Sequence, residues 1–132
     1  TIVRVARTEE MIESLRLALR RGPPSTDAVL VFPVDYALVE SAVVATVLRQ
    51  MRATTAEIVL PLFRDRPGHP VAVSSKLVPE IFEATTLRDV VASDRSRVEA
   101  VEVDSEWIHR DLDTPDDLAA ARIWLQEQGC SR

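Results

Sequence analysis

The spacing of apolar residues predicts strands that alternate with helices along the chain. Apolar runs within residues 28–32 and 57–63 are typical of strands covered on both faces, and residues 97–104 alternate as a half-buried strand does. Between the first two, Val39, Val43 and Val47 recur every four residues, which predicts an amphipathic helix over 38–51. This alternation is typical of an α/β fold with a mainly parallel sheet.

The remaining stretches extend the same pattern. Thr114 and Asp117 have the spacing of a capping box, and Gly129 is predicted to end the helix that follows it. Pro61 lacks a backbone donor, which predicts a bend or the strand's end near that point. The other predicted elements are a strand at 1–6, a helix at 8–21 capped by Thr8, an extended segment at 71–73, short helices at 76–83 and 86–93, and the last helix at 114–129.

Length and composition restrict the class of protein. At 132 residues, 46% of them apolar and 28% charged, we expect a single folded domain over 1–132. A net charge of -5 without a basic tail argues against nucleic acid as a partner. No apolar run is long enough for a membrane span, and the first residues given do not have the pattern of a signal peptide. The single cysteine, Cys130, can form no internal disulfide, and a cytoplasmic location is expected.

The stretch PVDYALVE, residues 33–40, places a carboxylate just after an apolar strand. In open α/β sheets, ligands bind outside the carboxyl ends of the strands, so Asp35 could hold a hard cation such as Mg²⁺. An aspartate after a strand also commonly satisfies backbone donors in a turn. This stretch alone leaves both interpretations open.

A second acidic group lies in HRDLDTPDDL, residues 109–118. Asp111 and Asp113 are two residues apart, so in an extended segment their side chains face the same side. Paired carboxylates repel each other unless a cation or a basic group is near, and Arg110 is the nearest alternative partner. Asp116 and Asp117 are better explained as first-turn residues of the following helix.

The turn RPGHP, residues 66–70, holds a histidine between two conformationally special residues. Gly68 allows unusual backbone angles and Pro70 fixes the exit of the turn, so His69 could be presented to a ligand. An incidental surface histidine is the equally simple alternative. A zinc site is poorly supported because the other histidine, His109, and Cys130 are distant in sequence, and no hydrolase motif surrounds the serines of VSSK.

Four stretches follow one another in the chain: PVDYALV, RPGHPVAVSSKLVPEI, LRDVV and DLDTPDDLAAA. In this order they resemble the MobA-like nucleotidyltransferases, the family of molybdenum cofactor guanylyl- and cytidylyltransferases. The helix containing Ser14, Leu15 and Arg16 also resembles a segment of this family. The resemblance implies a three-layer Rossmann-like fold of the nucleotide-diphospho-sugar transferase type. It also implies Mg²⁺-dependent transfer of a nucleoside monophosphate from an NTP, GTP or CTP, to a phosphorylated acceptor such as molybdopterin, with release of pyrophosphate.

The resemblance also assigns roles to residues. It implies that Asp35 and Asp111 bind the catalytic Mg²⁺ and that Asp113 completes the metal and phosphate site. It places Gly68, His69 and Pro70 beside the acceptor.

Two departures from the family pattern are visible. Ala37 stands where the family commonly has proline, and the family's glycine-rich nucleotide loop has no counterpart among Gly22, Gly68 and Gly129. We therefore expect the C-terminal portion of such a domain, inactive alone. Its 28–32 strand, central in a complete sheet, would be left with a bare edge through which the chain self-associates. The alternatives are a non-catalytic binding or assembly module of the same fold, and a nucleotidyltransferase for sugar phosphates or isoprenoid precursors.

Overall fold

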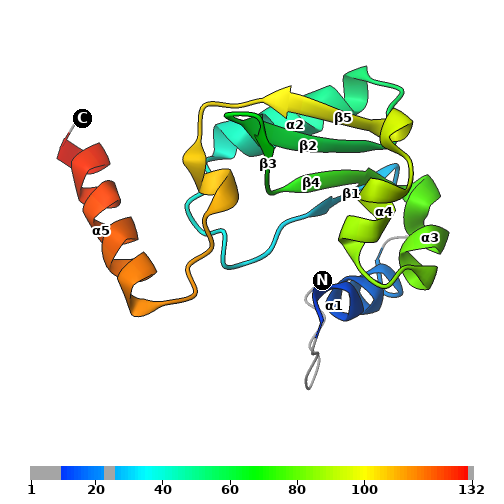
Figure 1. Cartoon of the computed structure of the whole chain (residues 1–132), viewed down its shortest axis with the longest axis horizontal. Coiled ribbons are helices and arrows are strands. Elements are labelled where there is room, and N and C mark those ends of the chain that lie inside the picture. Colours follow the sequence, from blue (N-terminus) through cyan, green and yellow to red (C-terminus); the bar gives the residue numbers. More distant parts are fainter. Residues whose placement is uncertain (1–9, 23–25, 131–132) are drawn as a thin grey trace.

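A computed structural model describes residues 10–22 and 26–130, so the strand predicted at 1–6 and the cap at Thr8 lie outside the described residues. One sheet carries helices on both faces (Figure 1), in a mixed α/β, Rossmann-like arrangement that confirms the predicted class. None of the described helices is both long and apolar enough to cross a membrane. The helices are α1 (Met11–Leu19), α2 (Ser41–Ala53), α3 (Val78–Glu83), α4 (Leu87–Ser93) and α5 (Pro115–Cys130), with 3₁₀ turns η1 (Ser75–Leu77), η2 (Arg95–Arg97) and η3 (Glu106–His109). The strands are β1 (Ala28–Val31), β2 (Ile58–Phe63), β3 (Arg66–Pro67), β4 (Val71–Ser74) and β5 (Val98–Glu102).

The main strands lie in the order β1-β4-β2-β5, and short β3 extends the sheet beside the end of β2. Strands β1, β2 and β5 run in one direction, whereas β4 runs antiparallel between β1 and β2. The segment predicted only as briefly extended is therefore a full internal strand. Within the described part of the chain β1 pairs with β4 alone, so β1 is an edge strand and not the central strand expected of a complete sheet.

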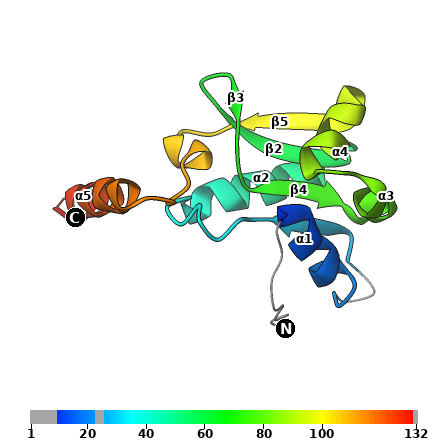
Figure 2. The same ribbon diagram turned by 60° about the horizontal axis from the view of Figure 1, so that its bottom comes forward.

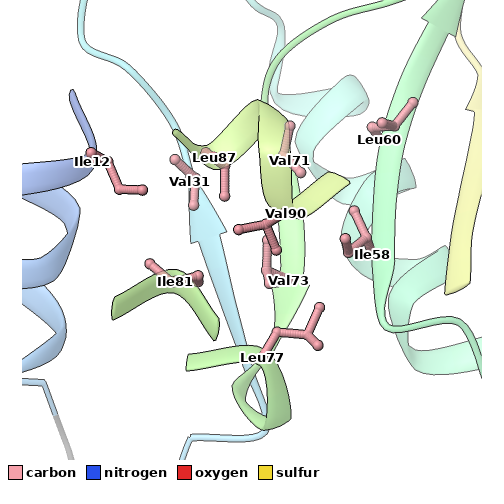
Figure 3. Close-up of a cluster of buried hydrophobic side chains, with 10 residues drawn as sticks. All are labelled: Ile12, Val31, Ile58, Leu60, Val71, Val73, Leu77, Ile81, Leu87 and Val90. Atoms are coloured by element: carbon pink, nitrogen blue, oxygen red, sulfur yellow. The ribbon is translucent and has the colours of Figure 1, made fainter. Parts of the chain in front are cut away.

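The two faces of the sheet pack against different helices. Helix α2 covers one face, where Val47 meets Val59 and Ala72 in a small buried cluster. Helices α1, α3 and α4 cover the other face (Figures 1 and 3). The larger core there consists of Ile12, Val31, Ile58, Leu60, Val71, Val73, Leu77, Ile81, Leu87 and Val90.

An arginine secures α1 against this layer. The side chain of Arg16 donates from Nε to the carbonyl oxygen of Ile81 at 3.0 Å and from a second nitrogen to that of Ala84. These carbonyls lie at the C-terminal end of α3, where helix carbonyls lack partners within the helix. The serine-leucine-arginine segment therefore has a structural role in this chain.

Strand β2 runs through Pro61 and ends at Phe63, close to the strand end predicted near Pro61. Pairing of β2 with β4 stops at Val59, and pairing with β3 starts at Leu62. Pro61 lies in the gap between these two pairings, and on the opposite side of β2 it stays in register with Val101 of β5. Its carbonyl oxygen accepts a hydrogen bond from Gly68 N at 3.0 Å.

Helix α5 projects away from the sheet in both ribbon views (Figures 1 and 2). Trp124 contacts Trp107 of η3 edge to face, with ring centroids 5.2 Å apart. Much of the apolar surface of α5 is uncovered, because the side chains of Leu118, Ile123 and Leu125 are 44%, 58% and 51% exposed. The helix also continues through Gly129, which was wrongly predicted to end it.

Candidate active site

Two loops far apart in sequence meet beyond the carboxyl ends of β1 and β5. Asp35 lies in the loop that joins β1 to α2, and Asp111 and Asp113 lie between η3 and α5. A backbone hydrogen bond of 3.0 Å from Leu112 N to Asp35 O holds the loops together. One carboxylate oxygen from each aspartate lies within 4.8 Å of the other two. The predicted convergence of these three side chains is confirmed.

Side chains alternate in direction along this extended segment, so the residues on either side of Leu112 face the other way. Asp111 and Asp113 are exposed, and Asp35 is half-buried. The charge of Asp111 raises the pKa of the Asp113 carboxyl, with smaller contributions from burial and from Asp35. Arg110, the alternative partner considered from the sequence, pairs instead with Glu106 at 3.5 Å. The cluster is thus a region of concentrated negative charge.

This donor set fits a hard divalent cation. Magnesium and manganese favour oxygen ligands at roughly 2.1 Å in octahedral geometry, which places neighbouring ligand oxygens roughly 3 Å apart. Carboxylate oxygens within 4.8 Å reach that spacing by small side-chain rotations. Asp117 does not join them, because it accepts hydrogen bonds from Thr114 N and Oγ1 at 2.9 and 2.7 Å in the predicted capping box.

The RPGHP turn is attached to η3, which precedes the acidic pair. His69 N donates to Ile108 O at 2.9 Å, and the imidazole Nε2 of His109 lies 2.8 Å from Arg66 O. A Cβ atom added to Gly68 would lie only 2.3 Å from the carbonyl oxygen of Ile108. The glycine is therefore required by the close approach of two backbones.

A cavity of about 370 Å³ opens beside this turn. Its titratable side chains other than Tyr36 are all basic, which is notable in a chain of net charge -5. Of the residues assigned to the acceptor, Gly68 and His69 line the cavity, while Pro70 is fully buried. The complete lining is Met11, Tyr36, Arg66, Pro67, Gly68, His69, Val71, Leu87, Arg88, Val91, Ile108 and His109.

Two aromatic rings form the boundary between the cavity and the carboxylates. The ring centroids of Tyr36 and His69 are 4.7 Å apart, with the planes tilted by 57°. Burial lowers the pKa of His69, against the opposing charge of Asp35. Burial also raises the pKa of Tyr36, and the charges of Asp111, Asp35 and Asp113 raise it further. At neutral pH these effects favour an uncharged imidazole and a phenol that keeps its proton.

Tyr36, Ile108 and His109 are site residues that the sequence did not reveal. Tyr36 follows Asp35 directly, so its position in the same loop was the available signal. Ile108 is an ordinary apolar residue whose importance lies in its backbone carbonyl, and no sequence pattern marks such a contact.

The fold is a Rossmann-like α/β domain, and its acidic cluster has the oxygen donors that a metal ion could use. The family model of the MobA-like NTP transferase domain matches residues 1–101, and the chain belongs to that family. The match includes Asp35 and the 66–70 turn, whereas Asp111 and Asp113 lie beyond it. No curated protein matches the sequence significantly.

Solved structures show the same fold. The crystal structure of Rv0371c from Mycobacterium tuberculosis H37Rv has a TM-score of 0.75 and 26% identity, covering 87% of this chain and 60% of that one. The Rv0371c complex with manganese has a TM-score of 0.67 and 27% identity, covering 81% and 57%. The molybdopterin-guanine dinucleotide biosynthesis protein A from Archaeoglobus fulgidus has a TM-score of 0.66 at 21% identity, covering 89% and 64%, and supports the fold alone. The chain spans about three fifths of the length of these relatives.

Proposed function

We propose that this chain carries the cation and acceptor side of a nucleotidyltransferase active site. The observation that supports this most directly is the meeting of Asp35, Asp111 and Asp113 from loops far apart in sequence. Membership of the MobA-like family supports the reaction class, and the manganese complex of Rv0371c supports a divalent cation. Mg²⁺ is the proposed ion, with Asp35 and Asp111 as ligands and Asp113 completing the site.

The proposed reaction transfers a nucleoside monophosphate from GTP or CTP to a phosphorylated acceptor of the molybdopterin type. An oxygen of the acceptor phosphate forms a bond to the α-phosphorus, and the bond from that phosphorus to the β-phosphate oxygen breaks, so pyrophosphate leaves. A divalent cation would neutralise charge on the phosphoryl groups and align them. The chain's own contribution is positioning and charge, and this chemistry needs no protein nucleophile.

The acceptor is proposed to occupy the cavity beside Gly68 and His69. Its basic side chains, Arg66, Arg88 and His109 among them, complement an anionic substrate. The carboxylate cluster lies next to this cavity, across the Tyr36 ring. The acceptor phosphate would therefore approach the cation from the basic side.

Cation binding to the 132-residue chain tests the proposal. Titration with Mn²⁺, followed by the electron paramagnetic resonance signal of the free ion, should reveal one site in the wild-type chain. Asp35→Asn and Asp111→Asn should each weaken binding by about tenfold or more, because each removes a charged ligand. Asp116→Asn is the matched control, since this exposed aspartate lies outside the cluster.

Equal Mn²⁺ affinity in wild type and Asp35→Asn would contradict the assignment of the site.

A pyrophosphate-release assay with GTP or CTP and a molybdopterin acceptor tests activity separately. We expect no turnover from this chain alone, because its three glycines are dispersed and cannot form a loop of backbone amides around the nucleotide phosphates. We propose that a segment outside these 132 residues supplies that loop.

The edge of β1 that pairs with no other strand among the described residues is the proposed contact for self-association. An apolar cavity of about 490 Å³ adjoins this edge, lined by side chains of α1 and β1 that include Leu15, Leu19 and Val29. Unpaired strand edges beside apolar surface favour pairing with another chain. Light scattering over a concentration series should show mass increasing with concentration, and a constant monomer mass would contradict this proposal.

A further inference from the structure

Tyr36 lies at the junction of the carboxylate cluster and the basic cavity. It follows Asp35 in the chain, lines the cavity, and places its ring 4.7 Å from that of His69. Its backbone is fixed on both sides: Tyr36 N donates to Pro33 O at 3.2 Å, and Tyr36 O accepts from Val39 N at 3.3 Å. The side chain therefore projects from an ordered turn.

The phenolic hydroxyl lies close to the carboxylate cluster. It is close enough to Asp111, Asp35 and Asp113 for their charges to act on it. Among the described residues, burial and these charges account for the raised pKa of the phenol, and no hydrogen bond to the hydroxyl contributes. A tyrosine O–H is both a donor and an acceptor, and Tyr36 lines the cavity that a ligand would enter. A ligand oxygen at the junction would be a partner for the hydroxyl.

The charges on the two sides of Tyr36 indicate the chemical group that such a ligand would have. On one side are the carboxylates that suit a divalent cation, and on the other are the basic side chains of the cavity, which include Arg66 and Arg88. An anionic group is attracted by the bound cation and by the cavity together. A phosphate group satisfies both attractions, and its oxygens accept hydrogen bonds well.

We propose that Tyr36 is a substrate-binding residue whose hydroxyl donates a hydrogen bond to a phosphate oxygen of the acceptor between the cluster and the cavity. Packing against His69 holds the ring in place for this contact. This inference rests on the proposed function, because it assumes that the cluster holds a cation and that the acceptor enters from the basic cavity. It adds a residue that neither the sequence patterns nor the family resemblance assigned.

The test uses the 132-residue chain with inorganic phosphate as the probe. Calorimetric titration of phosphate into Mg²⁺-saturated protein should show binding to wild type and about tenfold weaker binding to Tyr36→Phe, the loss expected for one hydrogen bond to a charged group. Mn²⁺ affinity without phosphate should stay within about twofold, since the hydroxyl is not a cation ligand in this proposal. The ring protons of His69 should keep their NMR shifts in Tyr36→Phe and change in Tyr36→Leu, which removes the aromatic ring.

The outcomes separate this inference from the function on which it rests. If wild type binds no Mn²⁺, the proposed function fails and the role of Tyr36 fails with it. If wild type binds Mn²⁺ but phosphate affinity is equal in wild type and Tyr36→Phe, or phosphate does not bind at all, the inference alone is overturned. Loss of Mn²⁺ binding in Tyr36→Phe would also overturn it, because the residue would then support the cluster structurally.

Discussion

Replacing Gly68 with alanine should disturb the carboxylate cluster from outside it. The added Cβ would lie 2.3 Å from the carbonyl oxygen of Ile108 and 2.8 Å from that residue's Cβ. Ordinary contact begins at roughly 3.5 Å, so the turn and η3 must separate by about 1 Å. Because Asp111 follows Ile108 by three residues, that movement is transmitted to the acidic pair.

The energetic cost follows from the same contacts. Forcing extra volume into a packed contact costs about 1–3 kcal/mol, and weakening the bond from His69 N to Ile108 O adds about 1 kcal/mol. Against a typical unfolding free energy of about 5–15 kcal/mol, the variant should still fold. Urea denaturation followed by tryptophan fluorescence measures this loss. Mn²⁺ affinity should fall by about tenfold or more, as when residues that orient metal ligands are changed.

Gly22→Ala is the matched control for this experiment. A Cβ at Gly22 would meet its nearest atoms at 3.6 and 3.7 Å, which is ordinary contact. This variant should retain the Mn²⁺ affinity of wild type and unfold at a similar urea concentration. If Gly68→Ala behaved like Gly22→Ala in both measurements, the turn would not position the carboxylates and the reasoning would be refuted.

Three further predictions concern stability away from the cluster. Hydrogen bonds from Arg97 lower the pKa of Glu80, so their stabilisation is present above the unfolded pKa of about 4.3 and is lost as the pH falls through the lower folded value. Glu80→Gln should therefore reduce the urea midpoint at pH 7 and reduce it progressively less as the pH falls below about 4.3; an equal reduction at every pH would be inconsistent. Asp65 has a φ of 60° in the β2–β3 turn, so Asp65→Gly should stabilise the chain by about 0.5–1 kcal/mol, and a lower thermal midpoint would count against this. Trp124→Ala removes the edge-to-face contact with Trp107, so hydrogen exchange should accelerate in α5 but not in the sheet; unchanged exchange in α5 would show that the contact does not hold the helix.

The helices were largely predictable because their signals are local, although the first helix begins at Met11, with Glu10 as its N-cap in place of the predicted Thr8. The Val43 and Val47 stripe buries against the sheet as expected, and the box formed by Thr114 and Asp117 has the predicted hydrogen bonds. The internal position of β4 was not predictable, because four residues carry too little periodicity to reveal two neighbouring strands. Strand order depends on contacts between segments that are distant in the chain.

Only part of the candidate site was predictable, because the rest depends on contacts between segments that are distant in the chain. Asp35 was selected by its position after a strand, and Asp111 and Asp113 were selected by their spacing of two residues before a helix. The structure brings the three together. The contact between Gly68 and Ile108 depends on backbone atoms that every residue possesses. Tyr36 acquires its significance from His69 and from the cluster, both supplied by the tertiary fold.

The hydrogen bond from Leu112 N to Asp35 O makes the acidic cluster sensitive to the number of residues in the segment that carries Asp111 and Asp113. Leu112 uses its main chain to join the other loop, while the residues on either side direct their carboxylates into the cluster. Exchange of Leu112 for another non-proline residue preserves that link, because any such residue has the N–H. Insertion or deletion of a single residue between His109 and Asp113 would reverse which side chains face the cluster, as a one-residue slip does in a strand. This segment should therefore tolerate changes in the identity of residue 112 far better than changes in length.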